Sequence, residues 1–222
     1  MQNTLFDSGF PEYIRKEYEH VIALLCKEVH STYKEVDGYN SENEIYILSD
    51  GTKIRFPYRI YCTDDDEVYL QLSDHEKLIY DCIFSRNSDG HIREKHIRNI
   101  LMTDFAEWCF PYILRLSADY VLEIVITIYD CLKKKDNISL QEFCRNNPKI
   151  VQTNYRRMYS YWCEYYRRKY PDFDTYIGTR LFSEIISVNS NLSWYNYIVC
   201  NCIKYDKITL LMKGVNNYGI CN

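Results

Sequence analysis

The chain has 222 residues and a net charge of −4, with 46% hydrophobic and 26% charged residues. Because it also contains only seven Gly and five Pro, this composition excludes an intrinsically disordered protein and predicts a single domain over residues 1–222. The apolar run 121–128 is interrupted by Glu123 and is far too short to cross a bilayer, so we expect no membrane insertion.

Charge and residue usage are uneven along the chain. Residues 1–80 carry 8 Lys/Arg and 16 Asp/Glu, a net charge of −8, whereas residues 149–222 carry 10 and 5, a net charge of +5. Such asymmetry bears on the choice of partners. The 23 tyrosines fit either the codon usage of an AT-rich genome or an aromatic contact surface. Ten cysteines without framework spacing, and no signal peptide, indicate reduced thiols in a cytoplasmic protein.

The N-terminal part, residues 1–72, is predicted to contain one helix and a small antiparallel sheet. The helix runs from Pro11 to about Thr32, where apolar and aromatic residues recur at helical spacing. After a polar loop over 34–44, Asp50-Gly51 separates two β-branched and aromatic runs, which is the pattern of a β-hairpin. Residues 58–61 and 68–70 are predicted to add strands on either side of the acidic turn Asp64-Asp65-Asp66-Glu67.

Residues 73–222 are predicted to be helical. Two capping boxes, Ser73 with Glu76 and Ser139 with Glu142, mark helix starts. Apolar periodicity places helices at about 74–86, 91–102, 105–116 with a break at Pro111, 118–134, 139–147, 149–170, 174–188 and 194–205. The run 121–130 is apolar around most of its circumference and is predicted to be the central buried helix. The fold class is therefore mainly α with a small antiparallel β-hairpin or sheet near the N-terminus (α+β), in an antiparallel helical stack for which a HEAT-like arrangement is one option.

The residues that could carry catalysis or bind a metal do not have the required spacing. His91 and His96 lie five positions apart, whereas a zincin-type site needs four, and His96 falls among apolar positions as a core histidine does. The acidic turn lacks the alternating ligands of a calcium loop and is predicted to be solvated. We therefore predict no catalytic residue, no metal ion and no cofactor, while a catalytic group assembled from distant residues stays open.

The stretch 149–170 interleaves basic and aromatic residues. In one interpretation its aromatic stripe packs in the core, and its basic face is solvated, with Glu164 paired to Arg168. In the other it forms a binding surface, in which Arg supplies bidentate contacts to anions and Tyr a stacking plane. The candidate residues for this surface are Arg156, Arg157, Tyr161, Arg167, Arg168 and Lys169.

Five short segments carry a resemblance: residues 57–61, 79–80, 90–97, 111–113 and 119–124. They are similar to a family of hypothetical proteins from low-GC bacteria, over about residues 44–185. The resemblance implies a cytoplasmic bacterial setting and brings no activity, fold or ligand with it. A salt bridge between Arg86 and Asp89 is expected at the turn between two helices. Both residues belong to a polar cluster whose residue types packing alone does not explain: Arg59, Arg86, Asp89, Arg93 and Glu94.

Three functions are compatible with these patterns. The first is a non-enzymatic protein-interaction module, an immunity-type or regulatory protein that offers Asp64, Asp65, Asp66 and Glu67 to a basic partner protein. The second is nucleic-acid binding through residues 149–170, which the acidic overall charge disfavours. The third is an enzyme whose site would be found as a pocket of converging titratable groups. The oligomeric state is left open by the sequence.

Overall fold

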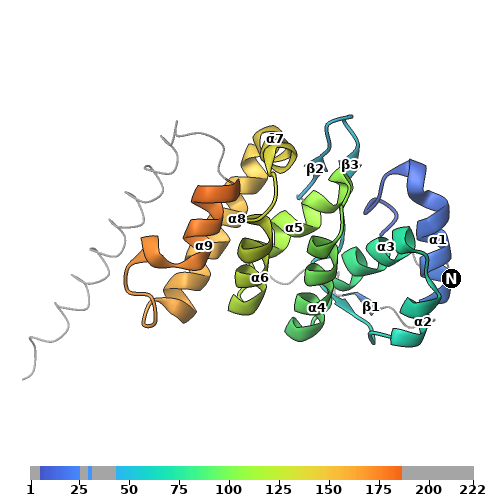
Figure 1. Ribbon diagram of the computed structural model, residues 1–222, viewed down its shortest axis with the longest axis horizontal. Helices are drawn as coiled ribbons and strands as arrows, with labels where there is room; N and C mark the ends of the chain where they lie inside the picture. Colours follow the sequence, from blue (N-terminus) through green and yellow to red (C-terminus); the bar gives the residue numbers. More distant parts are fainter. Residues whose placement is uncertain (1–5, 26–29, 32–43, 187–222) are drawn as a thin grey trace, which may run out of the picture. The chain divides into compact units, whose positions relative to one another are not determined.

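Helices dominate the residues that the computed structural model describes, which are 6–25, 30–31 and 44–186 (Figure 1). All of these residues belong to one compact unit, Met1–Val188. In chain order the helices are α1 (Arg15–Leu24), α2 (Asp66–Gln71), α3 (Asp74–Phe84), α4 (Gly90–Met102), α5 (Phe110–Leu116), α6 (Leu122–Leu132), α7 (Ile138–Asn146), α8 (Pro148–Tyr161) and α9 (Ile177–Arg180). The strands are β1 (His30–Ser31), β2 (Tyr46–Ile47), β3 (Lys53–Ile54) and β4 (Ile60–Tyr61).

The β-hairpin forms where Asp50-Gly51 predicted it. Strands β2 and β3 pair antiparallel, with Tyr46 opposite Ile54, and both of these side chains are buried. Gly51 has a φ of 85°, a left-handed conformation that favours glycine over residues with a Cβ atom. A second antiparallel pair joins β1 to β4, so residues 58–61 do contribute a strand. The predicted fold class, mainly helical with small antiparallel sheets near the N-terminus, is confirmed.

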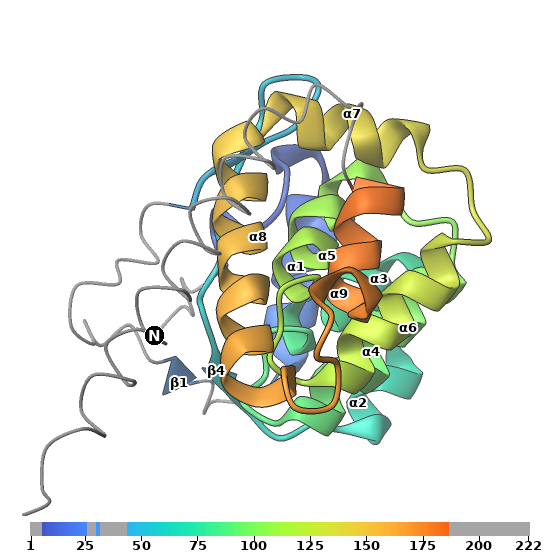
Figure 2. The same ribbon diagram turned by 90° about the vertical axis from the view of Figure 1, so that its left-hand side faces the viewer.

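Five of the helices form a row. Helices α1, α3, α4, α6 and α9 follow one another as neighbours along the molecule, from the blue end to the orange end of Figure 1. Successive helices in this row pack antiparallel. Helix α5 contacts both α6 and α8, and Figure 2 shows it between them, with α8 at one edge. This arrangement places residues of α4, α5 and α8 around a common interior.

The most deeply buried helix is α5, whose seven residues are all buried. The prediction that residues 121–130 form the central helix is only partly right, because α6 buries one face and exposes Glu123 and Ile126. Rings link α5 to the N-terminal segment: the ring centroids of Tyr112 and Phe56 lie 4.2 Å apart, and those of Phe56 and Tyr46 lie 5.3 Å apart. A polar residue carried by α5 is therefore placed inside the molecule.

Three predicted features are wrong. The helix predicted from Pro11 to about Thr32 ends at Leu24, and His30–Ser31 form strand β1. Residues 68–70 form part of α2 and not a strand, because the Asp65 side chain accepts hydrogen bonds from the backbone N–H groups of Glu67 and Val68 and so starts a helix. The capping box at Ser73 is present, but the one at Ser139 is not. Helix α7 begins at Ile138, so Ser139 lies inside its first turn.

Helix ends differ from the predicted ones in ways that matter for the site. The helix predicted over 105–116 begins as a 3₁₀ turn, Glu107–Cys109, and Pro111 lies in the first turn of α5, where its missing N–H costs no hydrogen bond. The helix predicted over 149–170 stays α-helical only to Tyr161 and continues as a π-helical turn, Trp162–Tyr166. The helix predicted over 174–188 is divided into a 3₁₀ turn, α9 and a second π-helical segment, Leu181–Ile186. The helix predicted over 194–205 lies outside the described residues.

Four cysteines of the described ranges are buried or partly buried free thiols. These are Cys82, Cys109, Cys131 and Cys144, and their free state agrees with the absence of framework spacing in the sequence. No helix within these ranges is long and apolar enough to cross a membrane.

Candidate functional site

Five arginine side chains converge inside the molecule from five separate segments. Four of them are buried, and the fifth, Arg157, is partly buried, with 13% of its side-chain surface exposed. They are carried by the segment before β4, the turn after α3, and helices α4, α5 and α8. We call this group the arginine cluster: Arg59, Arg86, Arg93, Arg115 and Arg157.

Asp119 is the first of two carboxylates that contact the arginine cluster. Its Oδ2 accepts hydrogen bonds from Arg59 Nη2 at 2.9 Å and from Arg93 Nε at 3.1 Å, and its Oδ1 accepts one from Arg93 Nη2 at 2.9 Å. Burial works to raise the pKa of Asp119, but the charges of Arg59 and Arg93 outweigh it and hold this pKa below its usual value. Asp119 is therefore ionised and shared between two guanidinium groups.

Glu44 is the second carboxylate. It accepts a hydrogen bond from Arg157 Nη2 at 2.7 Å and lies 3.4 Å from Arg115 Nε, while the Tyr46 hydroxyl donates to it at 3.2 Å. Burial again works to raise the pKa, and the charges of Arg115 and Arg157 lower it below its usual value. Glu44 thus connects α5 to α8 through two arginines.

Two members of the arginine cluster are poorly compensated. Arg86 is fully buried and donates to the backbone carbonyls of Pro57 and Tyr58, and burial together with neighbouring arginines holds its pKa well below the usual value. Arg115 has one ion-pair contact, to Glu44, and donates no hydrogen bond within residues 6–25, 30–31 and 44–186. Five guanidinium groups thus face two contacting carboxylates, an excess of three positive charges. Burying charge without a partner is costly, which makes this excess a mark of function.

Tyrosine rings lie above the arginine cluster and reach the surface. The guanidinium carbons of Arg59 and Arg115 lie 4.8 Å and 4.9 Å from the ring centroid of Tyr58, and Tyr58 is 38% exposed. Arg93 lies 5.4 Å from the ring centroid of Tyr120, which is 41% exposed. Neighbouring rings extend the surface, with centroid distances near 6 Å. We call this group the tyrosine surface: Tyr58, Tyr120, Tyr161 and Tyr165.

The hydroxyl of Tyr58 lies where negative charge is stabilised. Burial works to raise its pKa, but the charges of Arg59 and Arg115 and a hydrogen bond from Tyr161 outweigh it, so the pKa of Tyr58 lies below its usual value. The pKa of Tyr161, which is partly buried and donates to Tyr58, is raised to about 12. The site therefore favours an anion at the tyrosine surface.

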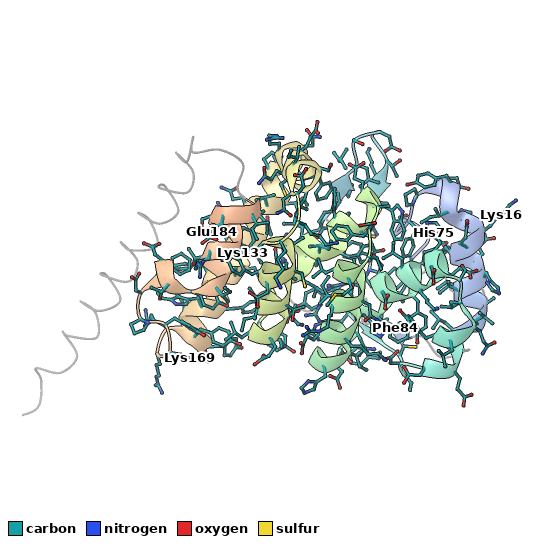
Figure 3. All side chains as sticks on the ribbon, viewed as in Figure 1. Lys16, His75, Phe84, Lys133, Lys169 and Glu184 are labelled. Carbon is teal, nitrogen blue, oxygen red and sulfur yellow. The ribbon has the colours of Figure 1, made fainter. Side chains whose placement is uncertain are left out.

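Most of the predicted basic surface lies outside the arginine cluster. Arg157 and Tyr161 belong to the site just described, whereas Arg156, Arg168 and Lys169 are exposed, as is Arg167. Figure 3 shows Lys169 directed away from the helices. The predicted ion pair between Glu164 and Arg168 is not among those of the described residues. The π-helical turn Trp162–Tyr166 changes the angular spacing on which that pair depends.

Only three of the five residues of the predicted polar cluster lie together in the structure. Arg59, Arg86 and Arg93 belong to the arginine cluster, but the predicted salt bridge between Arg86 and Asp89 is wrong. Asp89 instead caps α4, accepting a hydrogen bond from the His91 backbone N–H at 2.7 Å, while Arg86 turns inward to backbone carbonyls. Glu94 lies on the surface of α4 and pairs with Arg98, as expected for residues four apart.

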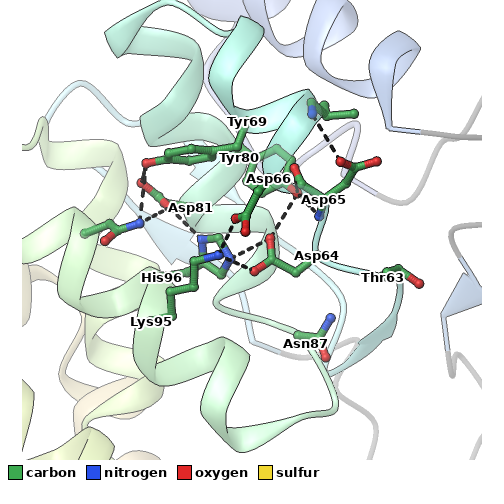
Figure 4. Close-up of polar contacts among 12 residues, drawn as sticks. Thr63, Asp64, Asp65, Asp66, Tyr69, Tyr80, Asp81, Asn87, Lys95 and His96 are labelled. Carbon is green, nitrogen blue, oxygen red and sulfur yellow. Dashed lines mark hydrogen bonds and ion pairs between the residues drawn. The ribbon is translucent and has the colours of Figure 1, made fainter.

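Within the acidic turn only Asp64 is largely covered by the protein (Figure 4), whereas Asp65, Asp66 and Glu67 are exposed, as expected of a solvated turn. Asp64 is only 11% exposed and lies 3.1 Å from His96 Nε2, and it accepts hydrogen bonds from Lys95 Nζ at 2.7 Å and from the Tyr80 hydroxyl at 3.1 Å. Asp65 caps α2, and Asp66 is exposed but also accepts from Lys95. Glu67 is exposed.

His96 is a core histidine, as predicted, and it lies between two aspartates. Its Nδ1 is 2.6 Å from Asp81 Oδ1, opposite the Asp64 contact. Burial works to lower the pKa of His96, but the contacts with Asp64 and Asp81 outweigh it and raise the pKa above its usual value. Within the residues placed in the structure, no group of three or more His, Cys, Asp or Glu side chains is arranged to hold a metal ion.

Six residues of the site were missed by sequence reasoning: Glu44, Tyr58, Arg115, Asp119, Tyr120 and Tyr165. Arg115 carries a signal that could have found it, because it is the single charged residue in the otherwise apolar or aromatic stretch 108–116. The other five have no distinctive local signal. No family model, curated protein or solved structure matches this chain.

Proposed function

We propose that this chain is a non-enzymatic protein-interaction module, regulatory or immunity-type, that holds an anionic group of its partner on the tyrosine surface. The observation that carries the proposal is the excess of three positive charges in the arginine cluster, of which Arg59, Arg93 and Arg115 lie against exposed tyrosine rings. Arginine and tyrosine are the residues that most often dominate the energetics of protein interfaces. Binding is favoured over catalysis because guanidinium groups do not exchange protons near neutral pH.

The proposal moves the docking surface away from the acidic turn. Asp64 contacts His96 and Lys95, and the exposed Asp65 carboxylate caps α2, which leaves Asp66 and Glu67 as the less engaged carboxylates of the turn. Even Asp66 is 2.8 Å from Lys95 Nζ, which reduces its attraction for an external cation. The tyrosine surface offers the larger uncompensated charge.

Binding of charged peptides tests the proposal. We expect a labelled polyglutamate peptide to bind about tenfold more tightly than a labelled polylysine peptide in fluorescence anisotropy at physiological salt. Arg115→Gln should remove this preference, whereas Arg145→Gln on the exposed face of α7 should leave it unchanged. Tighter binding of polylysine, lost in the double variant Asp66→Asn plus Glu67→Gln, would return the docking surface to the acidic turn.

Nucleic-acid binding is a second candidate function. It is favoured by one observation: Arg156, Arg168 and Lys169 are exposed around the end of α8, and Tyr165 beside them is 60% exposed. Within the described residues, neither Arg156 nor Arg168 is paired with a carboxylate. A basic surface with an exposed ring can contact a phosphate backbone and stack on a base.

A further inference from the structure

We propose that the anionic group held on the tyrosine surface is a phosphate monoester carried on a planar ring. This inference rests on the proposed function and specifies its ligand. Two observations point to this chemistry: the size of the charge excess beneath the rings, and the hydrogen-bonding capacity that Arg115 leaves unused.

The charge excess favours a dianion. A carboxylate would leave two of the three excess positive charges of the arginine cluster uncompensated, whereas a phosphate monoester near neutral pH carries a charge of about −1.5 to −2. Its three terminal oxygens can also accept several hydrogen bonds at once. A phosphate monoester therefore satisfies more of the buried charge than a carboxylate of similar size.

Arg115 supplies donors suited to such an anion. Its guanidinium group lies beneath the Tyr58 ring, and it donates no hydrogen bond to any residue that the structure describes, although the side chain is only 5% exposed. A planar guanidinium fork binds phosphate oxygens in pairs, which a lysine cannot do. We place the anion beside the Tyr58 hydroxyl, because the guanidinium groups of Arg59 and Arg115 lie against this ring and favour negative charge on its oxygen.

The tyrosine surface explains why a ring should accompany the phosphate. Tyr120 and Tyr161 lie with ring centroids 5.9 Å apart in an edge-to-face arrangement; the Arg93 guanidinium lies against the Tyr120 ring, and Tyr161 interacts with Tyr58. A planar ring attached to the phosphate can pack against these faces and add to the binding energy of the charge. Phosphotyrosine of a partner protein and a nucleoside monophosphate share this chemistry.

Calorimetric titration at constant ionic strength tests the inference with phenyl phosphate, phenyl sulfate and inorganic phosphate. We expect phenyl phosphate to bind about tenfold more tightly than either of the others. Because a bound dianion adds negative charge beside Tyr58, it should also move the onset of tyrosinate absorbance to higher pH. A phosphotyrosine peptide and adenosine monophosphate, titrated in parallel, distinguish the two sources of the ring.

Substitutions test the contribution of the arginine charge and that of the tyrosine ring separately. Arg115→Gln should abolish binding of phenyl phosphate, and Arg115→Lys should restore only part of it, while Arg145→Gln should bind as the native chain does. Tyr120→Ala leaves the arginines in place and should reduce the affinity for phenyl phosphate to that for inorganic phosphate. This second variant keeps the inference testable if Arg115→Gln fails to fold.

The outcomes distinguish this inference from the proposed function. Equal affinity for phenyl phosphate and phenyl sulfate would overturn the phosphate inference and leave an anion-binding module in place. Equal affinity for phenyl phosphate and inorganic phosphate would overturn the role of the ring. If none of these anions binds and polyglutamate shows no preference over polylysine, both proposals are wrong.

Discussion

Asp119 is the residue on which the buried charges of the site most depend. It is the carboxylate partner of both Arg59 and Arg93, and all three side chains are at least nine-tenths buried. Asp119→Asn keeps the shape but removes the charge, leaving two guanidinium groups without an anion. We expect the free energy of unfolding to fall by about 3–5 kcal/mol in urea denaturation, because an uncompensated buried charge is strongly destabilising.

A matched control lies on the next helix. Asp130→Asn on the exposed face of α6 removes the same charge from a solvated position and should change the free energy of unfolding by less than about 0.5 kcal/mol. A loss below about 1 kcal/mol for Asp119→Asn would contradict the view that this carboxylate compensates two arginines.

The protonation of His96 makes the free energy of unfolding depend on pH, in a direction that follows from its raised pKa. Its pKa is raised in the folded chain by Asp64 and Asp81, so its contribution is fully present below its unfolded pKa of about 6.5 and is lost as the pH rises through the folded value. Asp64 acts in the opposite sense, because its lowered pKa contributes stability that is fully present above the usual aspartate pKa of about 3.9 and is lost as the pH falls through the lower folded value.

We therefore expect the free energy of unfolding to be highest between about pH 4 and pH 6.5 and to decline above it. His96→Gln should be less stable than the native chain and should lack the decline on the alkaline side. The measurement is urea denaturation at closely spaced pH values. A native profile that rises steadily from pH 6 to pH 8 would show that His96 is not held in its charged form.

Single residues were predicted well where the signal is local. The position of His96 among apolar residues indicated a core histidine, and Glu94 with Arg98 followed from helical spacing. Arg157 and Tyr161 were named for one surface and Arg59, Arg86 and Arg93 for another, but the sequence could not show that they form one site. Their meeting depends on how α4, α5 and α8 pack, which no local pattern encodes.

At the element scale, Gly178 fixes how closely α9 approaches α8. A Cβ atom there would lie 2.6 Å from Tyr176 Cε1 and 2.8 Å from Met158 Cγ, both well inside van der Waals contact. Gly178→Ala should therefore lower the free energy of unfolding by about 1–3 kcal/mol, as overpacking does. Ser160→Ala, at an exposed position of α8, is the control and should be close to neutral. Equal stabilities in chemical denaturation would show that the two elements can separate freely.

The exposed basic residues around the end of α8 allow a test of the second candidate function, nucleic-acid binding. If Arg156, Arg168 and Lys169 engaged a phosphate backbone together, binding would weaken steeply with salt through counterion release. We expect instead only weak binding of labelled oligonucleotides, with a dissociation constant of about 0.1 mM at physiological salt in fluorescence anisotropy. The charge reversal to use is Arg156→Glu plus Arg168→Glu, since Arg157 is buried against Glu44 and its reversal would disturb the fold.

Micromolar binding at physiological salt, abolished by this double variant while its circular dichroism stays native, would establish nucleic-acid binding in place of the protein-interaction proposal.

Elements such as α8 were well predicted because apolar periodicity is a strong signal for long helices. The π-helical turn Trp162–Tyr166 that follows it was not, because its hydrogen bonds, such as Arg167 N–H to the Trp162 carbonyl at 2.8 Å, leave no separate mark on the residue pattern.

At the scale of the whole molecule, the N-terminal sheets are joined to the helices by contacts between residues far apart in the chain. Asn147 acts as a neighbouring strand would: its Oδ1 accepts from the Ile47 N–H and its Nδ2 donates to the Ile47 carbonyl, each at 2.8 Å. Glu107 accepts from the backbone and side chain of Ser49, and Asp119 binds Arg59. The hairpin itself was predictable from Asp50-Gly51, whereas these connections were not.

Because of these contacts, we expect β2 and the helices to unfold together. A two-stranded hairpin has little stability of its own in water, so Ile47 should be protected only while the helices remain folded. Hydrogen exchange is the measurement. The opening free energy of the Ile47 amide should match that of Ile113 in α5 and equal the global value from denaturation.

Asn147→Ala tests the connection directly. The substitution leaves the Ile47 N–H and carbonyl without their partner, and a lost buried hydrogen-bonding group costs about 1–3 kcal/mol. If the sheets and helices form one cooperative unit, this loss should appear equally at Ile47 and at Ile113, because both amides exchange through the same global opening. Faster exchange at Ile47 alone, with Ile113 unchanged, would show that residues 44–72 open independently of the helical stack.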